Sequence, residues 1–98
     1  MKDSLSTDLN SPSSIPYFLW DEPLTVAELK RKLNSASAEE RNRLLGKILR
    51  EARDTDVWKF TTPREVWRNW NELEKYLGRR REFWKFLCSF WDKEGLLG

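Results

Sequence analysis

Residues 37–52 read SAEERNRLLGKILREA, and this stretch shows most clearly how the chain folds. Its apolar residues recur at helical spacing and form one broad stripe: Leu44, Leu45, Ile48, Leu49 and Ala52. Ser37 and Glu40 make a capping box, in which each side chain accepts a hydrogen bond from the other residue's backbone amide. The stretch therefore predicts an amphipathic helix over residues 38–53.

The same helix-start signal occurs elsewhere in the chain. Thr25 with Glu28 forms one capping box, and Thr62 with Glu65 forms another. Pro63 then stands at the first helical position, where its missing N–H costs nothing. These boxes predict that two further helices begin near residues 26 and 63.

Glycines mark where helices end. Gly78 and Gly95 stand at positions that suit the left-handed residue after a helix. Together the signals predict helices near residues 26–35, 38–53, 63–70, 72–77 and 79–94. No stretch alternates convincingly between apolar and polar residues, and the strand-like piece at 56–61 is short. We predict an all-α fold, a compact bundle of about five short helices.

The first fourteen residues differ from the rest in composition. Residues 1–14 are rich in Ser, Thr, Asp and Asn and offer almost nothing to bury. We therefore predict a disordered N-terminal tail over 1–14 and a single helical domain over 15–98.

Several classes of protein are disfavoured by composition. The chain contains no histidine and one cysteine, Cys88, so it lacks the usual general base and the usual zinc ligands. Its four glycines are scattered and form no phosphate-binding loop. We expect no enzyme activity, no metal and no cofactor. With no run of about 20 apolar residues and no secretory signal, we expect a cytoplasmic protein that binds no membrane.

The richest aromatic segment is RRREFWKFLCSFW at 79–91. On a helical wheel its apolar residues cover an arc of about 200°, wider than the stripe of roughly 100° that a surface helix needs. We expect one side of this helix to pack in the core and the other to bind a protein. The candidate partner-binding residues are Trp84, Trp91, Phe86, Arg79, Arg80 and Arg81.

Other readings of this helix stay open. It can be central in the core on all apolar sides, or its aromatic residues can form a homodimer. It can also lie on a membrane surface, although Glu82 and Asp92 dilute the basic face that such a helix needs.

Nucleic-acid binding is the alternative function. Arg43, Lys47 and Arg50 share one side of the 38–53 helix, opposite its apolar stripe, where they can contact phosphates. A helix-turn-helix DNA-binding regulator is conceivable from the short helices that follow. The competing interpretation is a solvated face of mixed charge. A recognition helix should present polar side chains to base edges, whereas the 79–94 helix presents Phe and Trp.

Three segments carry a family resemblance: PYFLWDE at 16–22, LLGKILREARDTDVWKF at 44–60 and TPREV at 62–66. Their order resembles a group of small helical bacterial proteins encoded beside nucleotidyltransferase-type abortive-infection toxins. The matching residues are Phe18, Trp20, Asp21, Leu49, Arg50, Asp56, Trp58 and Val66. The resemblance implies an antitoxin that binds and restrains a partner toxin. It covers residues 16–66 and leaves the Trp-rich end outside.

Overall fold

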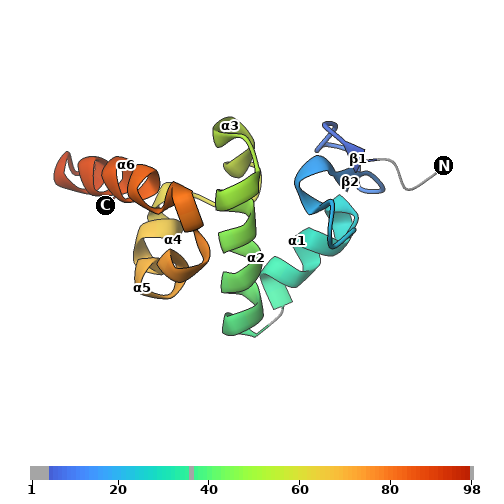
Figure 1. The fold of residues 1–98 in the computed structure, drawn as a ribbon, viewed down its shortest axis with the longest axis horizontal. Helices are drawn as coiled ribbons and strands as arrows, with labels where there is room; N and C mark the ends of the chain where they lie inside the picture. The colour runs from blue at the N-terminus through green and yellow to red at the C-terminus, as the bar shows by residue number, and fades with distance from the viewer. Residues whose placement is uncertain (1–4, 36, 98) are drawn as a thin grey trace.

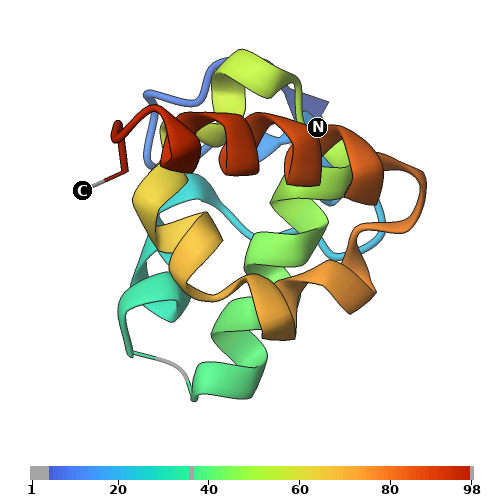
Figure 2. The ribbon, with the colours of Figure 1, turned by 90° about the vertical axis from the view of Figure 1, so that its left-hand side faces the viewer.

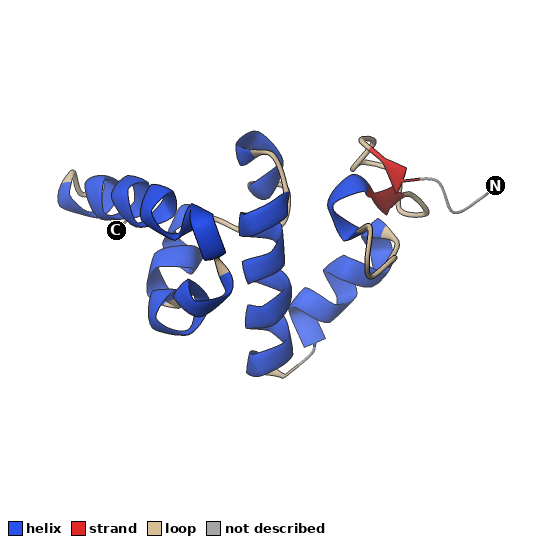
Figure 3. Cartoon of the chain, viewed as in Figure 1, coloured by secondary structure: helices blue, strands red, loops and turns tan. Residues whose placement is uncertain are grey.

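The computed structural model describes residues 5–35 and 37–97 (Figure 1). These residues form six α-helices, three short 3-10 helices and one pair of two-residue strands, so helix dominates (Figure 3). About 65% of the described residues are helical. The predicted all-α fold is confirmed.

The elements follow one another closely along the chain. The α-helices are α1 (Val26–Ser35), α2 (Ala38–Glu51), α3 (Asp54–Val57), α4 (Pro63–Arg68), α5 (Trp70–Leu73) and α6 (Arg81–Lys93). The remaining elements are β1 (Leu5–Ser6), β2 (Ile15–Pro16), η1 (Tyr17–Leu19), η2 (Glu74–Tyr76) and η3 (Gly78–Arg80). The strand-like piece forms the single turn α3 and the bend after it, and the helix predicted over 72–77 is split between α5 and η2.

The capping box at the start of α1 is complete. The Thr25 backbone amide donates to Glu28 Oε1 at 2.8 Å, and the Glu28 amide donates to Thr25 Oγ1 at 3.1 Å. These two bonds satisfy amides that the first turn of a helix leaves without an intrahelical partner. α1 therefore begins where the sequence predicts.

The other two boxes are half formed. Ser37 Oγ accepts from the Glu40 amide at 3.2 Å, and Thr62 Oγ1 accepts from the Glu65 amide at 3.1 Å. The Glu40 carboxylate instead receives hydrogen bonds from Arg43. The serine and threonine caps fix the starts of α2 and α4, and the glutamates are free for other contacts.

Two glycines end helical segments and a third allows a close contact. Gly78 and Gly95 have φ angles of +53° and +76°, in the left-handed region that side chains disfavour. At Gly46, a Cβ atom would lie 2.3 Å from Tyr76 Cβ. A side chain at this position would push η2 away from α2.

α2 is the centre of the molecule. In Figure 1, α1 lies on one side of it, and α4, α5 and α6 lie on the other. Figure 2 shows α6 crossing in front of α2. The stripe predicted from the sequence, Leu44, Leu45, Ile48, Leu49 and Ala52, is buried in one cluster that extends from Leu9 to Cys88. The helix therefore supplies the core with which both halves of the chain pack.

Residues 5–14 pack against the beginning of α1. The carbonyl of Ser14 accepts a hydrogen bond from the Val26 amide at 2.8 Å, and that of Pro12 accepts from the Ala27 amide at 3.0 Å. The first backbone amides of a helix have no intrahelical acceptor. Here two carbonyl groups of the preceding segment accept hydrogen bonds from them.

The predicted tail is therefore ordered over most of its length. Leu9 is 3% exposed and belongs to the core cluster, and β1 pairs in parallel with β2. The prediction of disorder over residues 1–14 is wrong for 5–14, while residues 1–4 lie outside the described part of the chain. Composition could not show the amides of α1 that anchor this polar segment.

Candidate functional site

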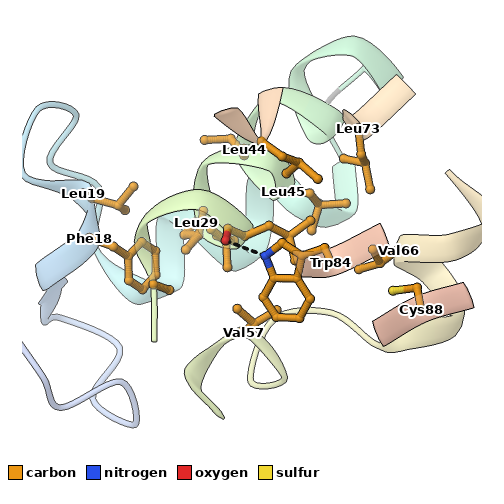
Figure 4. Packing of buried hydrophobic residues seen from close by; sticks show 14 of the residues in the cluster. Phe18, Leu19, Leu29, Leu44, Leu45, Val57, Val66, Leu73, Trp84 and Cys88 are labelled. Carbon is orange, nitrogen blue, oxygen red and sulfur yellow. Dashed lines mark hydrogen bonds between the residues drawn. The ribbon is translucent and has the colours of Figure 1, made fainter. Parts of the chain in front are cut away.

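The inner side of α6 is core. Trp84 is 1% exposed, and its Nε1 donates to the Leu49 carbonyl oxygen at 2.8 Å, the dashed bond in Figure 4. Its ring meets that of Trp58 edge to face, with centroids 5.6 Å apart. Trp84 was predicted to bind a partner, and this prediction is wrong, because the side chain points at α2 and fills the core there.

Trp91 lies at the edge of the same cluster. Its ring centroid is 6.1 Å from that of Trp58, and the side chain is half-buried. Trp91 therefore supports the packing of α6, and part of its side chain remains exposed.

The outer side of α6 is apolar and open. Phe86 is 69% exposed, Phe90 is 49% exposed and Phe83 is 39% exposed. We call these three residues the phenylalanine face. Their spacing of three and four residues places them along one side of the helix. A hollow of about 260 Å³ is lined by Phe86, Ser89, Phe90 and Lys93.

Sequence reasoning named only Phe86 from this face. Phe83 and Phe90 are three residues before it and four after it, which is the spacing of neighbours on a helix. That spacing was the available signal for the whole face. What the sequence could not show was which edge of the wide apolar arc would turn towards α2.

Arg80 is held by the protein itself. It forms an ion pair with Asp54, and its guanidinium carbon lies 4.7 Å from the Phe83 ring centroid and 5.3 Å from that of Trp84. A cation over an aromatic face is attracted by the ring electrons. Arg80 therefore connects α6 to α3.

The two neighbouring arginines differ from each other. Arg81 forms ion pairs with Glu74 and Glu82, and the hydrogen bond from Arg81 to Glu74 raises the pKa of this arginine. Arg79 is exposed on η3. Of the three arginines predicted to bind a partner, Arg79 is the one that the ion pairs of this region leave open.

On α2, Arg43 lies between two carboxylates. Its guanidinium donates to both carboxylate oxygens of Glu22, at 2.9 and 2.7 Å, and to both of Glu40, at 2.9 Å each. These hydrogen bonds lower the pKa of each glutamate and raise that of Arg43. The fork geometry matches the arginine to both carboxylates, which leaves little of its charge for a phosphate.

Lys47 is a buried cation. It is 6% exposed, forms an ion pair with Asp21, and lies 3.6 Å from a carboxylate oxygen of Glu22. The hydrogen bond from Lys47 lowers the pKa of Asp21. Charged groups are buried at a high cost unless they are paired, so this lysine serves the attachment of residues 20–25 to α2.

Arg50 is also engaged. Its Nε donates to Glu51 at 2.9 Å, and its NH1 donates to the carbonyl oxygen of Tyr76 at 2.8 Å. The structure therefore brings Arg43, Lys47 and Arg50 to one side of α2 as predicted, but ties each of them to acceptors within the chain. These three residues do not form an open basic surface.

Most residues that carry the family resemblance have structural contacts. Phe18 is buried in the core, and Asp56 accepts a hydrogen bond from the Tyr17 hydroxyl at 2.6 Å. Burial is the main cause that raises the pKa of Tyr17. Trp20 is the exception, since 64% of it is exposed.

The described residues show neither a metal site nor a membrane span. Within 5–35 and 37–97, no three or more His, Cys, Asp and Glu side chains are grouped to hold a metal ion. In the same ranges no helix has the length and apolar character needed to cross a bilayer. Burial raises the pKa of the Cys88 thiol to about 11, so the group is protonated at neutral pH and is a poor nucleophile.

Of the six large apolar side chains that are exposed among the described residues, three form the phenylalanine face on one helix, and the others are Leu5, Trp20 and Leu96. No family model matches the chain, and neither a curated protein nor a solved structure matches it.

Proposed function

We propose that this chain is a protein-interaction module that binds a partner protein through the phenylalanine face of α6. The observation that carries the proposal is the exposure of Phe86 and Phe90, 69% and 49%, on a helix whose opposite side buries Trp84 and Cys88. A small domain that buries Trp84 and Cys88 completely has no packing reason to hold two phenylalanines in water.

The energy available from this face is substantial. Fully burying a phenylalanine side chain is worth roughly 1.5–3 kcal/mol, so covering the exposed parts of Phe86 and Phe90 would contribute about 1–2 kcal/mol each. Aromatic residues are also enriched at the centres of protein interfaces. Lys85 and Lys93 are exposed on the same helix and provide a basic rim.

We further propose that the partner is a toxin of the nucleotidyltransferase type, encoded nearby, and that the chain acts as its antitoxin. This part rests on the resemblance of residues 16–66. The mechanism is masking: the phenylalanine face covers part of the toxin surface and restrains it.

The test is co-expression of the tagged protein with the products of its neighbouring genes, followed by light scattering of the eluted species. We expect a stoichiometric complex. The variant Phe86→Ala/Phe90→Ala should lose this complex and keep the circular dichroism spectrum of the wild type. The matched control is Glu39→Ala/Glu72→Ala, which changes two exposed residues away from α6 and should leave the complex intact.

Other outcomes would overturn the proposal in different ways. A complex that survives the loss of both phenylalanines would place the interface elsewhere. A homodimer that the same variant dissociates would mean that the face binds a second copy of the chain, and that the toxin is not its partner.

The helix-turn-helix alternative stays a prediction without a favouring observation. α4 and α5 contain six and four residues. The basic residues predicted to contact DNA are Arg43, Lys47 and Arg50, and each of them is paired with or hydrogen-bonded to an acceptor within the chain.

A further inference from the structure

A second group of basic side chains lacks the carboxylate partners that Arg43, Lys47 and Arg50 have. Lys30, Lys59, Arg64 and Arg68 are all exposed, and we call them the cationic band. Within the described residues, none of them forms an ion pair with a carboxylate. Arg43, Lys47 and Arg50 of α2 are thus paired within the protein, whereas the ion pairs of the described residues leave the band open to an outside anion.

Each end of the band borders a hollow with an aromatic ring in its wall. A hollow of about 280 Å³ is lined by Lys30, Leu33, Asn34, Lys59 and Phe60. A second hollow, of about 400 Å³, is lined by Arg64, Trp67, Arg68, Asp92 and Leu97. The Lys30 Nζ atom lies 5.9 Å from the Phe60 ring centroid. Six of these ten lining residues are cationic or aromatic, and Asp92 is the one carboxylate among them.

The two hollows lie close together along the chain, since Phe60 lines the first and Arg64, four residues later, lines the second. Thr61 is buried, whereas Phe60 is half-buried and Thr62 is exposed. Thr62 has extended backbone angles, φ −132° and ψ 157°. Phe60 lies in the turn that follows α3, where its amide donates to the Val57 carbonyl oxygen at 3.0 Å, and Thr62 caps the start of α4.

Arg64 is positioned by a contact that leaves its outer atoms available. Its Nε donates to the Leu97 carbonyl oxygen at 2.9 Å. Among the described residues, no acceptor is bonded to its two terminal nitrogens. A guanidinium held in this way presents both nitrogens to a phosphate, which it can bind through two parallel hydrogen bonds.

We propose that the cationic band binds single-stranded nucleic acid. Phosphates of the strand contact the four cations, and bases stack on the rings of Trp67 and Phe60. This site is separate from the phenylalanine face, so it stands or fails independently of the proposed protein partner.

The presence of both aromatic rings and cations favours single-stranded nucleic acid over a duplex or an acidic peptide. Sites for single strands join a basic groove to aromatic side chains on which successive bases stack. A duplex keeps its bases stacked inside and is read by an element that enters a groove, for which α4, with six residues, is short. An acidic peptide would pair with the cations, but it has no series of flat bases that could stack on Trp67 and Phe60.

The experiment is fluorescence anisotropy of a labelled 12-nucleotide DNA strand of mixed sequence, titrated with the full chain. Four phosphate contacts on a single strand predict a slope of log K against log salt of about −2.8. The affinity should therefore fall about 50-fold between 50 and 200 mM salt. A duplex of the same sequence should bind more weakly than the strand.

A charge variant and its control test the band directly. Arg64→Ala/Arg68→Ala should reduce the slope to about −1.4, so that the same change in salt costs about sevenfold. Arg41→Ala/Lys75→Ala removes the same charge from residues outside the band, and should keep the original slope. Equal weakening by both variants would overturn the proposal, because it would show a general attraction to a positive protein.

The stacking role has its own test. Trp67→Leu should weaken strand binding about tenfold, and Trp67→Phe, which keeps a ring, should weaken it less. Circular dichroism of both variants checks that the fold is kept. If a twelve-residue polyglutamate displaces the strand as well as unlabelled DNA does, the band takes any polyanion and the proposal is wrong.

Discussion

Both sides of α6 carry apolar side chains, which are buried on the inner side and exposed on the outer side. On the inner side, Trp84 and Cys88 are buried completely, and the Trp84 indole also donates a hydrogen bond to α2. On the outer side, Phe86 and Phe90 stand in water. Phe86 follows Trp84 by two positions in the chain, which is about 200° around a helix.

This contrast shows that apolar composition alone does not assign a residue to the core. The inner side of α6 meets α4 and, through Trp84, also α2, and the side chains of Trp84 and Cys88 that point there are buried. The apolar arc is wider than those neighbours can cover. The surplus is the phenylalanine face, and the following predictions test how sharply the two sides differ.

The largest effect is expected for Trp84→Ala. It should lower the free energy of unfolding by about 3–5 kcal/mol, because it opens a large cavity and leaves the Leu49 carbonyl without its donor. Urea unfolding followed by circular dichroism measures this loss. Trp84→Phe should lose less, since it refills most of the volume. A folded Trp84→Ala variant of unchanged stability would contradict the assignment of this side chain to the core.

The next effect concerns thiol reactivity at adjacent positions. Cys88 is buried and Ser89 is exposed. A thiol reagent should modify Cys88 of the wild type on the order of a hundredfold more slowly than the cysteine of Ser89→Cys/Cys88→Ala, because Cys88 reacts only when the structure opens. Absorbance of the released product gives both rates. In urea the two proteins should react alike, and equal rates in the native state would contradict the burial of Cys88.

A smaller effect should appear at alkaline pH. Burial raises the pKa of Cys88 to about 11, whereas an unfolded cysteine titrates near about 8.5. Between these values the unfolded chain releases a proton that the native chain keeps, so rising pH favours unfolding. The unfolding free energy of the wild type should therefore fall relative to that of Cys88→Ala from about pH 8.5 to about pH 11. Urea titrations at several pH values check this, and parallel curves would refute it.

The smallest effect on stability is expected on the outer side. Phe86→Ala/Phe90→Ala should change the free energy of unfolding by only about 0.5 kcal/mol, since both rings are largely exposed and alanine favours the helix. Thermal and urea unfolding measure this. A loss as large as that of Trp84→Ala would erase the difference between the two sides and remove the support for the proposed interface.

The candidate site was only partly predictable. That α6 would divide into a core side and an exposed apolar side followed from its wide apolar arc. Which residues fell on each side did not follow, and Trp84 was placed wrongly. The wheel gives angles around a helix axis, but the direction of the neighbouring helices is fixed by the whole fold.

The basic residues of α2 also depend on contacts that are distant in the sequence. The sequence grouped Arg43 and Lys47 correctly on one face of α2. Their partners, Glu22 and Asp21, lie 21 and 26 residues earlier in the chain. No local pattern indicates such pairs, and they decide whether a cation is available to a ligand.

What the sequence by itself determined is the local structure. Caps at Thr25, Ser37 and Thr62 and stops at Gly78 and Gly95 depend on residues within a few positions of each other, so their signals are complete in the sequence. Folding the chain decided what each helix face meets. Trp84 finds the Leu49 carbonyl 35 residues away, and the segment before α1 finds amides that composition cannot reveal. These long-range contacts decide which side chains are buried or paired. They also leave the phenylalanine face and the cationic band exposed.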